Sequence, residues 1–146
     1  MKAAAFAYVR AANLDEAISL LATHGADAKL LAGGQSLLPM LNLRVTAPGV
    51  VVDIGGIADL RGIRIDGGMM KIGALTRHAD LLMSPEIASR APLLAKAVPH
   101  IAHPAIRNRG TIGGNLAHAD PASELPACVQ ALGATLIARG RGGNAA

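Results

Sequence analysis

The sequence predicts a mixed α/β fold built from many short elements, and three observations lead to this. The chain of 146 residues is 51% apolar and only 16% charged, so it can bury a core and is not intrinsically disordered. Its 17 glycines and 8 prolines are more than an idealised helical bundle tolerates. Strand-like and helix-like hydrophobic patterns also alternate along the chain. The length fits one domain better than two.

The N-terminal residues predict a strand followed by a helix. Phe6–Val9 is the candidate strand. Asn13 and Glu16 have the spacing of a helix capping box, with Asn in place of Ser or Thr. Apolar residues then recur at helical spacing, so we expect a helix up to about His24, ended by Gly25.

A strand, a glycine-rich turn and a helix start are expected next. Lys29–Leu31 is a brief buried strand that leads directly into Gly33 and Gly34. One or two apolar helical turns follow from Ser36 to Leu43. Val50–Ile54 is predicted as another strand, closed by a second glycine pair.

The middle of the chain predicts a hairpin and two helices. Gly62–Asp66 and Met69–Gly73 flank a glycine pair, which is typical of a β-hairpin. Thr76 is the expected cap of a short helix that runs through Met83. Ser84-Pro85-Glu86 then offers a cap, a first-turn proline and a first-turn acid for a helix to about Val98.

The last third of the chain predicts a second glycine-rich turn, a helix and a final strand. The turn is Thr111–Asn115, and a polar loop at His118–Ser123 separates it from a helix over Glu124–Leu132. Ala134–Ala138 is the expected strand, read as one arm of a hairpin whose return strand is missing. We therefore expect an unpaired strand edge.

Most of the positive charge lies in the second half of the chain. The formal net charge is +4, and residues 61–146 carry ten Lys and Arg against five Asp and Glu. A solvated basic face explains this balance most simply. Arg107 and Arg109 are candidates to balance a bound anion or to dock a partner, and a solvated pair explains them equally well. The chain has no Trp, one Tyr and one Phe, so it lacks the stacking platforms of single-strand nucleic-acid readers. Nucleic acid is therefore not an expected partner.

The cysteine and histidine content argues against a metal or cluster site within the chain. Cys128 is the single cysteine and lies in an apolar stretch, which excludes a disulfide framework and a CxxC motif. A buried thiol in a reducing compartment is the expectation. Four histidines show no metal-ligand spacing with one another or with this thiol, and they are His78, His100, His103 and His118. No metal is predicted.

No membrane span is expected either. The uncharged stretch Leu30–Leu43 contains glycines, a proline and polar residues, and it is shorter than the ~20 apolar residues that a spanning helix needs. The apolar segment Ala3–Val9 is short for the core of a signal peptide. The sequence therefore predicts a cytoplasmic protein.

The two glycine-rich turns, at residues 32–36 and 111–115, are the features most informative about function. Glycine lets backbone N–H groups approach a ligand closely, and successive N–H groups make a cradle for an anion such as a diphosphate. The helix expected from Ser36 adds its positive end. Taken singly, each turn is weak evidence for a ligand site and is better explained as an ordinary tight turn. Neither fits the GxGxxG or the P-loop pattern, which disfavours a nicotinamide-binding Rossmann domain or an NTPase.

Four segments resemble the FAD-binding medium subunit of molybdenum hydroxylases, a family that includes the carbon monoxide dehydrogenase medium subunit and the xanthine dehydrogenase flavin domain. They are Leu31–Pro39 (LAGGQSLLP), Val52–Gly55 (VDIG), Ile72–Thr76 (IGALT) and above all Ile106–Pro126 (IRNRGTIGGNLAHADPASELP). The match runs in the family's order from about Phe6 to Gly140, and the carbon monoxide dehydrogenase-like branch looks closest.

The resemblance implies an α+β fold with two lobes that bind FAD, of the PCMH (vanillyl-alcohol oxidase-like) type. It implies a small N-terminal α/β lobe at residues 1–55 with the first FAD loop. A larger α+β lobe at residues 56–146 would carry the second FAD loop. Because family members continue further, the second lobe is expected to be incomplete and truncated, and the C-terminal domain to be absent.

The resemblance also assigns residues to the cofactor, residue by residue. Those that fall on the first FAD loop are Ala32, Gly33, Gly34, Gln35 and Ser36. Those that fall on the second are Thr111, Ile112, Gly113, Gly114 and Asn115. Glu124 falls where the family has an acid that accepts hydrogen bonds from the adenosine ribose, and it also suits the first turn of a helix. No residue is expected to act as a catalytic acid, base or nucleophile.

By this resemblance the chain is an oxidoreductase subunit that relays electrons through FAD to an external acceptor. The implied partners are an iron–sulfur small subunit and a molybdenum–pterin large subunit, because this chain has no cluster ligands of its own. The alternative is a truncated, non-redox ligand-binding or assembly module that no longer holds FAD. A basic nucleic-acid binder is a third and weaker possibility.

Overall fold

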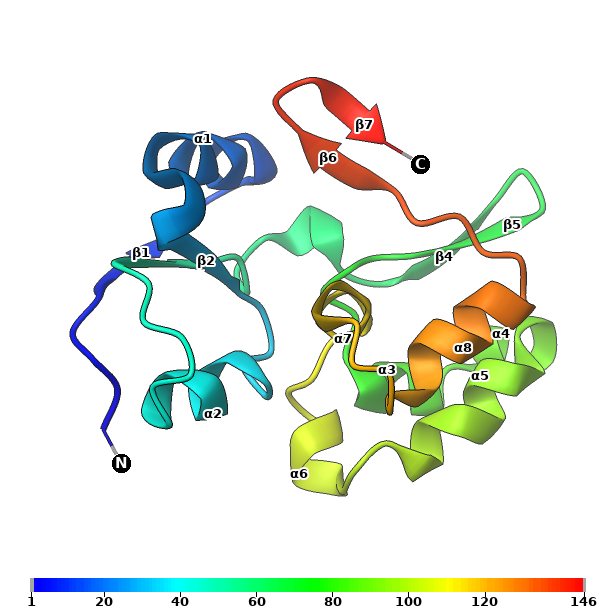
Figure 1. Ribbon diagram of the computed structural model, residues 1–146. Coiled ribbons are helices and arrows are strands. Elements are labelled where there is room, and N and C mark those ends of the chain that lie inside the picture. The colour runs from blue at the N-terminus through cyan, green and yellow to red at the C-terminus, as the bar shows by residue number, and fades with distance from the viewer. Residues whose placement is uncertain (1, 146) are drawn as a thin grey trace. The chain divides into compact units, whose positions relative to one another are not determined.

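A computed structural model describes residues 2–145 and divides them into two compact units. The first contains the residues up to Ile57 together with those from Thr135 onward, and the second is Ala58–Ala134 (Figure 1). The boundary between the units lies after Ile57, close to the division between residues 55 and 56 that the sequence suggested. The C-terminal segment groups with the first unit, whereas the sequence placed it in the second lobe.

The first unit is built on a three-stranded parallel sheet. Its strands are β1 (Ala7–Arg10), β2 (Ala28–Leu31) and β3 (Val50–Asp53), in the order β1-β3-β2. The three valines of β3 are buried, as expected for the central strand of a parallel sheet that is covered on both faces. The carboxyl ends of β2 and β3 therefore lie side by side, with Leu31 opposite Asp53.

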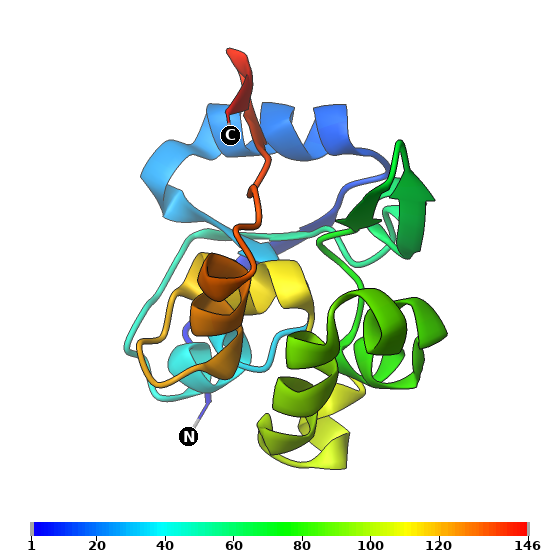
Figure 2. The same cartoon turned by 90° about the vertical axis from the view of Figure 1, so that its right-hand side faces the viewer.

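Helix α1 (Leu14–His24) confirms the helix and both boundaries that the sequence predicted. The Asn13 side chain accepts a hydrogen bond from the Glu16 amide at 2.9 Å, and the Glu16 carboxylate accepts one from the Ala12 amide at 2.7 Å. Gly25 ends the helix with a φ of 55°. The helix contacts β2 and β3 and lies along one side of the sheet (Figure 1, Figure 2).

The second unit combines a β-hairpin with six short helices. The hairpin consists of β4 (Ile63–Asp66) and β5 (Met69–Ile72), joined by two glycines with positive φ, as predicted. Its helices are α3 (His78–Met83), α4 (Pro85–Arg90), α5 (Pro92–Ala97), α6 (Pro104–Arg107), α7 (Ile112–His118) and α8 (Glu124–Ala131). The fully buried side chains at the centre of the unit include Leu81, Ile87, Val98 and Leu125.

Two of the helix predictions in this unit need correction. The helix expected from Ser84 to Val98 is broken into α4 and α5, because Pro92 forces Ala91 out of the helical region. Thr76 does not cap α3, which begins after Arg77. The Thr76 hydroxyl instead donates to the Gly62 carbonyl at 3.0 Å and accepts from the Gly62 amide at 3.1 Å.

The C-terminal segment also differs from its prediction. Residues 134–137 form no strand, and the first strand there is β6 (Ala138–Gly140). It pairs antiparallel with β7 (Gly143–Ala145), so the expected missing return strand is present. The apolar side chains of Leu136 and Ile137, within the predicted strand, are exposed.

Candidate functional site

The first candidate segment, residues 32–36, follows β2 and precedes helix α2 (Leu37–Asn42). It therefore lies at the carboxyl end of a parallel strand, where α/β sheets bind ligands. Gly34 has a φ of +73°, and a Cβ there would stand 3.0 Å from a methyl of Leu38 and 3.2 Å from a methyl of Leu31. The backbone conformation favours glycine at this position, and a side chain there would also have to push the two leucine side chains aside.

The backbone amides of this segment fit an anion. The amides of Gly33, Gly34, Gln35 and Ser36 have no hydrogen-bond acceptor among residues 2–145. The side-chain amide of Gln35 donates to the Gly33 carbonyl at 2.9 Å and so stiffens the turn. Four consecutive amides without internal acceptors are available to an anion such as a diphosphate.

Asp53, which sequence reasoning did not single out, fixes the strand end beside this segment. One carboxylate oxygen accepts from the Gly55 amide at 2.7 Å, and the other accepts from the Tyr8 hydroxyl. The hydrogen bond to Asp53 raises the pKa of Tyr8 above its ordinary value. The adjacent Ile54 amide donates to the Leu31 carbonyl at 3.0 Å, which ties β3 to the residue before the candidate segment.

The second candidate segment, residues 111–115, is a helix start and not a glycine-rich turn. Thr111 caps α7, and its hydroxyl accepts from the Gly114 amide at 3.2 Å. The Ile112 amide donates to the Thr76 carbonyl at 3.0 Å, and the Gly113 amide donates to the Ala74 carbonyl at 2.9 Å. The amides that the sequence assigned to an anion cradle are therefore already bonded within the unit.

The two glycines of this segment have different surroundings. A Cβ at Gly113 would stand 2.5 Å from the Ala74 Cβ and 2.7 Å from the Ala74 carbonyl oxygen, so glycine lets α7 pack against this backbone. Gly114 is exposed. What the segment can offer a ligand is therefore the bare backbone surface at Gly114 and the amide side chain of Asn115.

The structure brings Glu124 beside this second segment. The Asn115 side-chain oxygen accepts from the Ser123 hydroxyl at 2.8 Å, which joins α7 to the residue that precedes α8. Glu124 is the first residue of α8 and is half-buried. Its charge acts on two neighbours, because it opposes the lowering of the pKa of His78 and adds to the burial that raises the pKa of Cys128.

Arg107 has a structural role that the sequence did not reveal. Its guanidinium nitrogen Nη1 donates to the carbonyls of Ile101 at 2.8 Å, Ala102 at 3.1 Å and Pro99 at 3.3 Å. These bonds hold the turn before α6, in which Ala102 has a positive φ of 42°. Arg107 is thus bonded to backbone carbonyls within its own unit, whereas Arg109 is exposed.

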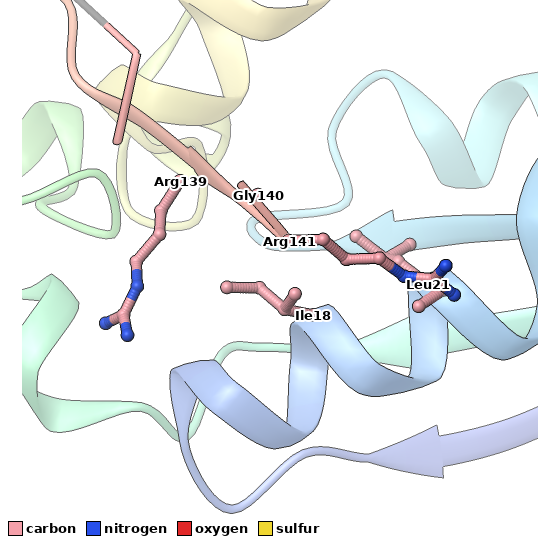
Figure 3. A pocket seen from close by; sticks show the side chains of 6 residues that line it. Ile18, Leu21, Arg139, Gly140 and Arg141 are labelled. Carbon is pink, nitrogen blue, oxygen red and sulfur yellow. The ribbon is translucent and has the colours of Figure 1, made fainter. Parts of the chain in front are cut away.

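A pocket of about 220 Å³ in the first unit contains none of the candidate residues. Figure 3 shows Ile18 and Leu21 on α1 beneath the segment that carries Arg139, Gly140 and Arg141, and Ala22 completes the lining. Arg139, one of the lining residues, also forms an ion pair with Asp15 of α1 at 2.9 Å. Among residues 2–145, no three His, Cys, Asp or Glu side chains are grouped as metal ligands, and no helix is long and apolar enough to cross a membrane.

Residues 4–146 match the family described as the FAD binding domain in molybdopterin dehydrogenase. The chain belongs to this family, and FAD is the cofactor that the family binds. This confirms the resemblance that the motifs indicated, and the first segment with its four available amides fits the diphosphate of that cofactor.

Among known proteins, the chain is similar to medium-sized subunits of several dehydrogenases. It is 51% identical over 95% of its length to the 6-hydroxypseudooxynicotine dehydrogenase complex subunit alpha of Paenarthrobacter nicotinovorans. It is 48% identical over 95% of its length to the carbon monoxide dehydrogenase medium chain of Hydrogenophaga pseudoflava. These alignments cover 47% and 48% of the two relatives, so the chain spans about half of their length.

Solved structures show the same likeness in three dimensions. A carbon monoxide dehydrogenase from Hydrogenophaga pseudoflava matches 99% of this chain with a TM-score of 0.97 and 47% identity. Quinoline 2-oxidoreductase from Pseudomonas putida 86 matches 99% of it with a TM-score of 0.95 and 41% identity. In each case the match covers 50% of the solved chain. The mixed helix and strand architecture of these solved chains is thus the fold of this chain.

Proposed function

We propose that this chain is the FAD-binding portion of an electron-transfer subunit of a molybdenum hydroxylase. The observation that carries the proposal is the row of four backbone amides at residues 33–36, which have no acceptors among residues 2–145, in a chain of the FAD-binding family. When bound, FAD accepts electrons and passes them to an external acceptor. The protein's own contribution is to bind and orient the cofactor.

Each candidate residue has a defined task in this proposal. The amides of Gly33 to Ser36 donate to the anionic diphosphate, and the Gln35 side chain keeps the turn in the receptive conformation. The second segment, Thr111, Ile112, Gly113, Gly114 and Asn115, contributes an approach surface at Gly114 rather than free amides. Glu124 accepts hydrogen bonds from ribose hydroxyls, since a carboxylate offers two acceptor oxygens.

The proposal extends to the fold type, the location and the partners. The two units are taken as parts of the two lobes of a PCMH-type fold, and the protein is taken as cytoplasmic, which the buried single thiol supports. Electrons would come from an iron–sulfur small subunit and a molybdenum–pterin large subunit. Relatives named as subunits of dehydrogenase complexes support an assembly of this kind.

FAD binding tests the proposal directly. Titration of the purified chain with FAD should quench flavin fluorescence and raise the melting temperature, because a ligand that binds only the folded state stabilises it. If the first segment holds the diphosphate, ADP-ribose should compete with FAD, whereas riboflavin, which has no phosphate, should not. A chain that neither binds FAD nor is stabilised by it would support the alternative, a non-redox module.

Gly34→Ala should weaken FAD binding by about tenfold, because a side chain at positive φ strains the turn and displaces the amides. The matched control is Gly140→Ala, where a Cβ meets nothing within 4 Å, and it should bind FAD as the wild type does. The measurement is the dissociation constant from the fluorescence titration, with the melting temperature of the FAD-free chain as a check on folding. Equal affinities of the two variants would exclude the first segment as the diphosphate site.

A further inference from the structure

His78 is a buried histidine that lies next to the second candidate segment. Its side chain is 3% exposed, and its Nδ1 atom has no hydrogen-bond partner among residues 2–145. A buried polar atom without a partner costs stability and calls for an explanation. The sequence assigned no role to this histidine, because it lacks metal-ligand spacing with the other histidines and with Cys128.

Both the backbone and the ring of His78 contact Gly110, the residue immediately before the segment. The His78 amide donates to the Gly110 carbonyl at 3.0 Å, next to the bridge between Arg77 and Thr111. A Cβ at Gly110 would stand 2.8 Å from Cδ2 and 3.0 Å from Nε2 of the imidazole. Two ring atoms therefore occupy the space that a side chain at Gly110 would need, so the ring is packed against the backbone that leads into α7.

The surroundings of this ring disfavour its charged form. Burial is the main cause that lowers the pKa of His78 below its ordinary value near 6.5, Glu124 on α8 opposes the shift, and Arg107 on α6 adds to it. None of these causes comes from the exposed charged or titratable groups on α3 and its cap residue, or on the neighbouring α4, α5 and η3 (Val98–His100). They are Arg77, Asp80, Glu86, Arg90, Lys96 and His100.

We propose that His78 is a positioning residue for FAD, acting through Gly110 to hold the segment Thr111–Asn115 in its binding conformation. The inference rests on the proposed function, because it concerns the same cofactor site. When the ring takes up a proton, the charged imidazole has no partner for Nδ1 in its buried position. The ring must then move, and Gly110 with the start of α7 moves with it.

The sign of the pH effect follows from the lowered pKa. Below pH 6.5 the unfolded or displaced ring binds a proton more readily than the packed one, so the packed conformation loses stability as the pH falls. Above pH 6.5 both forms are neutral and the packed conformation keeps its full stability. FAD affinity should therefore decline on acidification through the range below 6.5.

The first test is the pH profile of FAD binding between pH 8 and pH 5. The wild type should lose about tenfold in affinity across this range, while His78→Gln, which cannot titrate, should give a flat profile. His118→Gln is the matched control, because His118 is exposed on α7 and its loss should leave the wild-type profile unchanged. A flat wild-type profile, or a sloping one in His78→Gln, would overturn the inference.

The second test is a pair of compensating substitutions. Gly110→Ala should weaken FAD binding because the new methyl group meets the imidazole, and adding His78→Ala should restore part of the affinity by making room. If the double variant binds no better than Gly110→Ala alone, the contact between ring and backbone does not position the segment.

A third measurement separates this inference from the proposed function. In the FAD-free chain, the backbone amide signals of Gly110 and Thr111 should shift in nitrogen-15 NMR spectra with the same midpoint as the His78 ring. A wild type that binds no FAD would refute the proposed function, and the positioning of FAD with it. A wild type that binds FAD while these amides do not follow His78 would refute only the positioning role.

Discussion

At the residue scale, the guanidinium of Arg107 shows how much local structure one side chain can hold. Three carbonyls from one turn converge on its Nη1 atom, and the turn contains an alanine with positive φ. A charged donor makes stronger hydrogen bonds than a neutral one. The turn therefore depends on this side chain more than on its own sequence.

Arg107→Ala should lower the free energy of unfolding by about 1–2 kcal/mol, because three backbone carbonyls lose a charged donor. Arg107→Lys should recover only part of this loss, since an ammonium group lacks the planar fork of a guanidinium. Arg109→Ala, at an exposed site two residues on, should change stability by less than about 0.5 kcal/mol. Urea unfolding of the three variants measures these differences, and equal values for Arg107→Ala and Arg109→Ala would contradict the structural role.

At the element scale, the first turn of α7 combines a cap with close packing. The Thr111 hydroxyl and the Ala74 and Thr76 carbonyls take up the amides that a helix start normally leaves free. Glycine at position 113 allows the approach to Ala74. Helix α7 is thereby fixed to the segment between β5 and α3. Gly113 allows this close packing, Gly114 is exposed, and neither forms a turn.

Gly113→Ala tests this packing, because the contact and the helix propensity predict opposite signs. Alanine in place of glycine usually stabilises a helix by about 1 kcal/mol. Here the added methyl would overlap the Ala74 backbone, so we expect a net loss of about 1–3 kcal/mol in the free energy of unfolding. A rise in melting temperature on this substitution would show that α7 and Ala74 are less closely packed than described.

At the scale of the whole molecule, local signals could be predicted from the sequence and long-range contacts could not. Helix α1 follows from its capping residues and Gly25, and the β4-β5 hairpin follows from its glycine pair. The helix start at Thr111 could not be foreseen, because the amides of Ile112 and Gly113 bond to residues more than thirty positions earlier.

The candidate site also combines residues with a local sequence signal and residues without one. Glycine chemistry indicated the first segment as a candidate, its assignment to FAD came from the family motif, and its amides have no acceptors among residues 2–145. Glu124 and the second segment were assigned through the family motif, and the structure places them beside one another in one unit. The burial of His78 and the bonds of Arg107 depend on neighbours that no local pattern indicates.

The hydrogen bond between Tyr8 and Asp53 gives the chain a built-in optical reporter. Tyr8 is the only tyrosine, and the chain has no tryptophan, so its ultraviolet emission comes from the first unit alone. A carboxylate that accepts a proton from an excited phenol quenches its emission, so the folded chain should be dim near the tyrosine maximum. Unfolding of the sheet should brighten it, and Tyr8 emission against urea would then follow the first unit while circular dichroism follows the helices of both. An Asp53→Asn variant that is as dim as the wild type when folded would show that the carboxylate does not quench Tyr8.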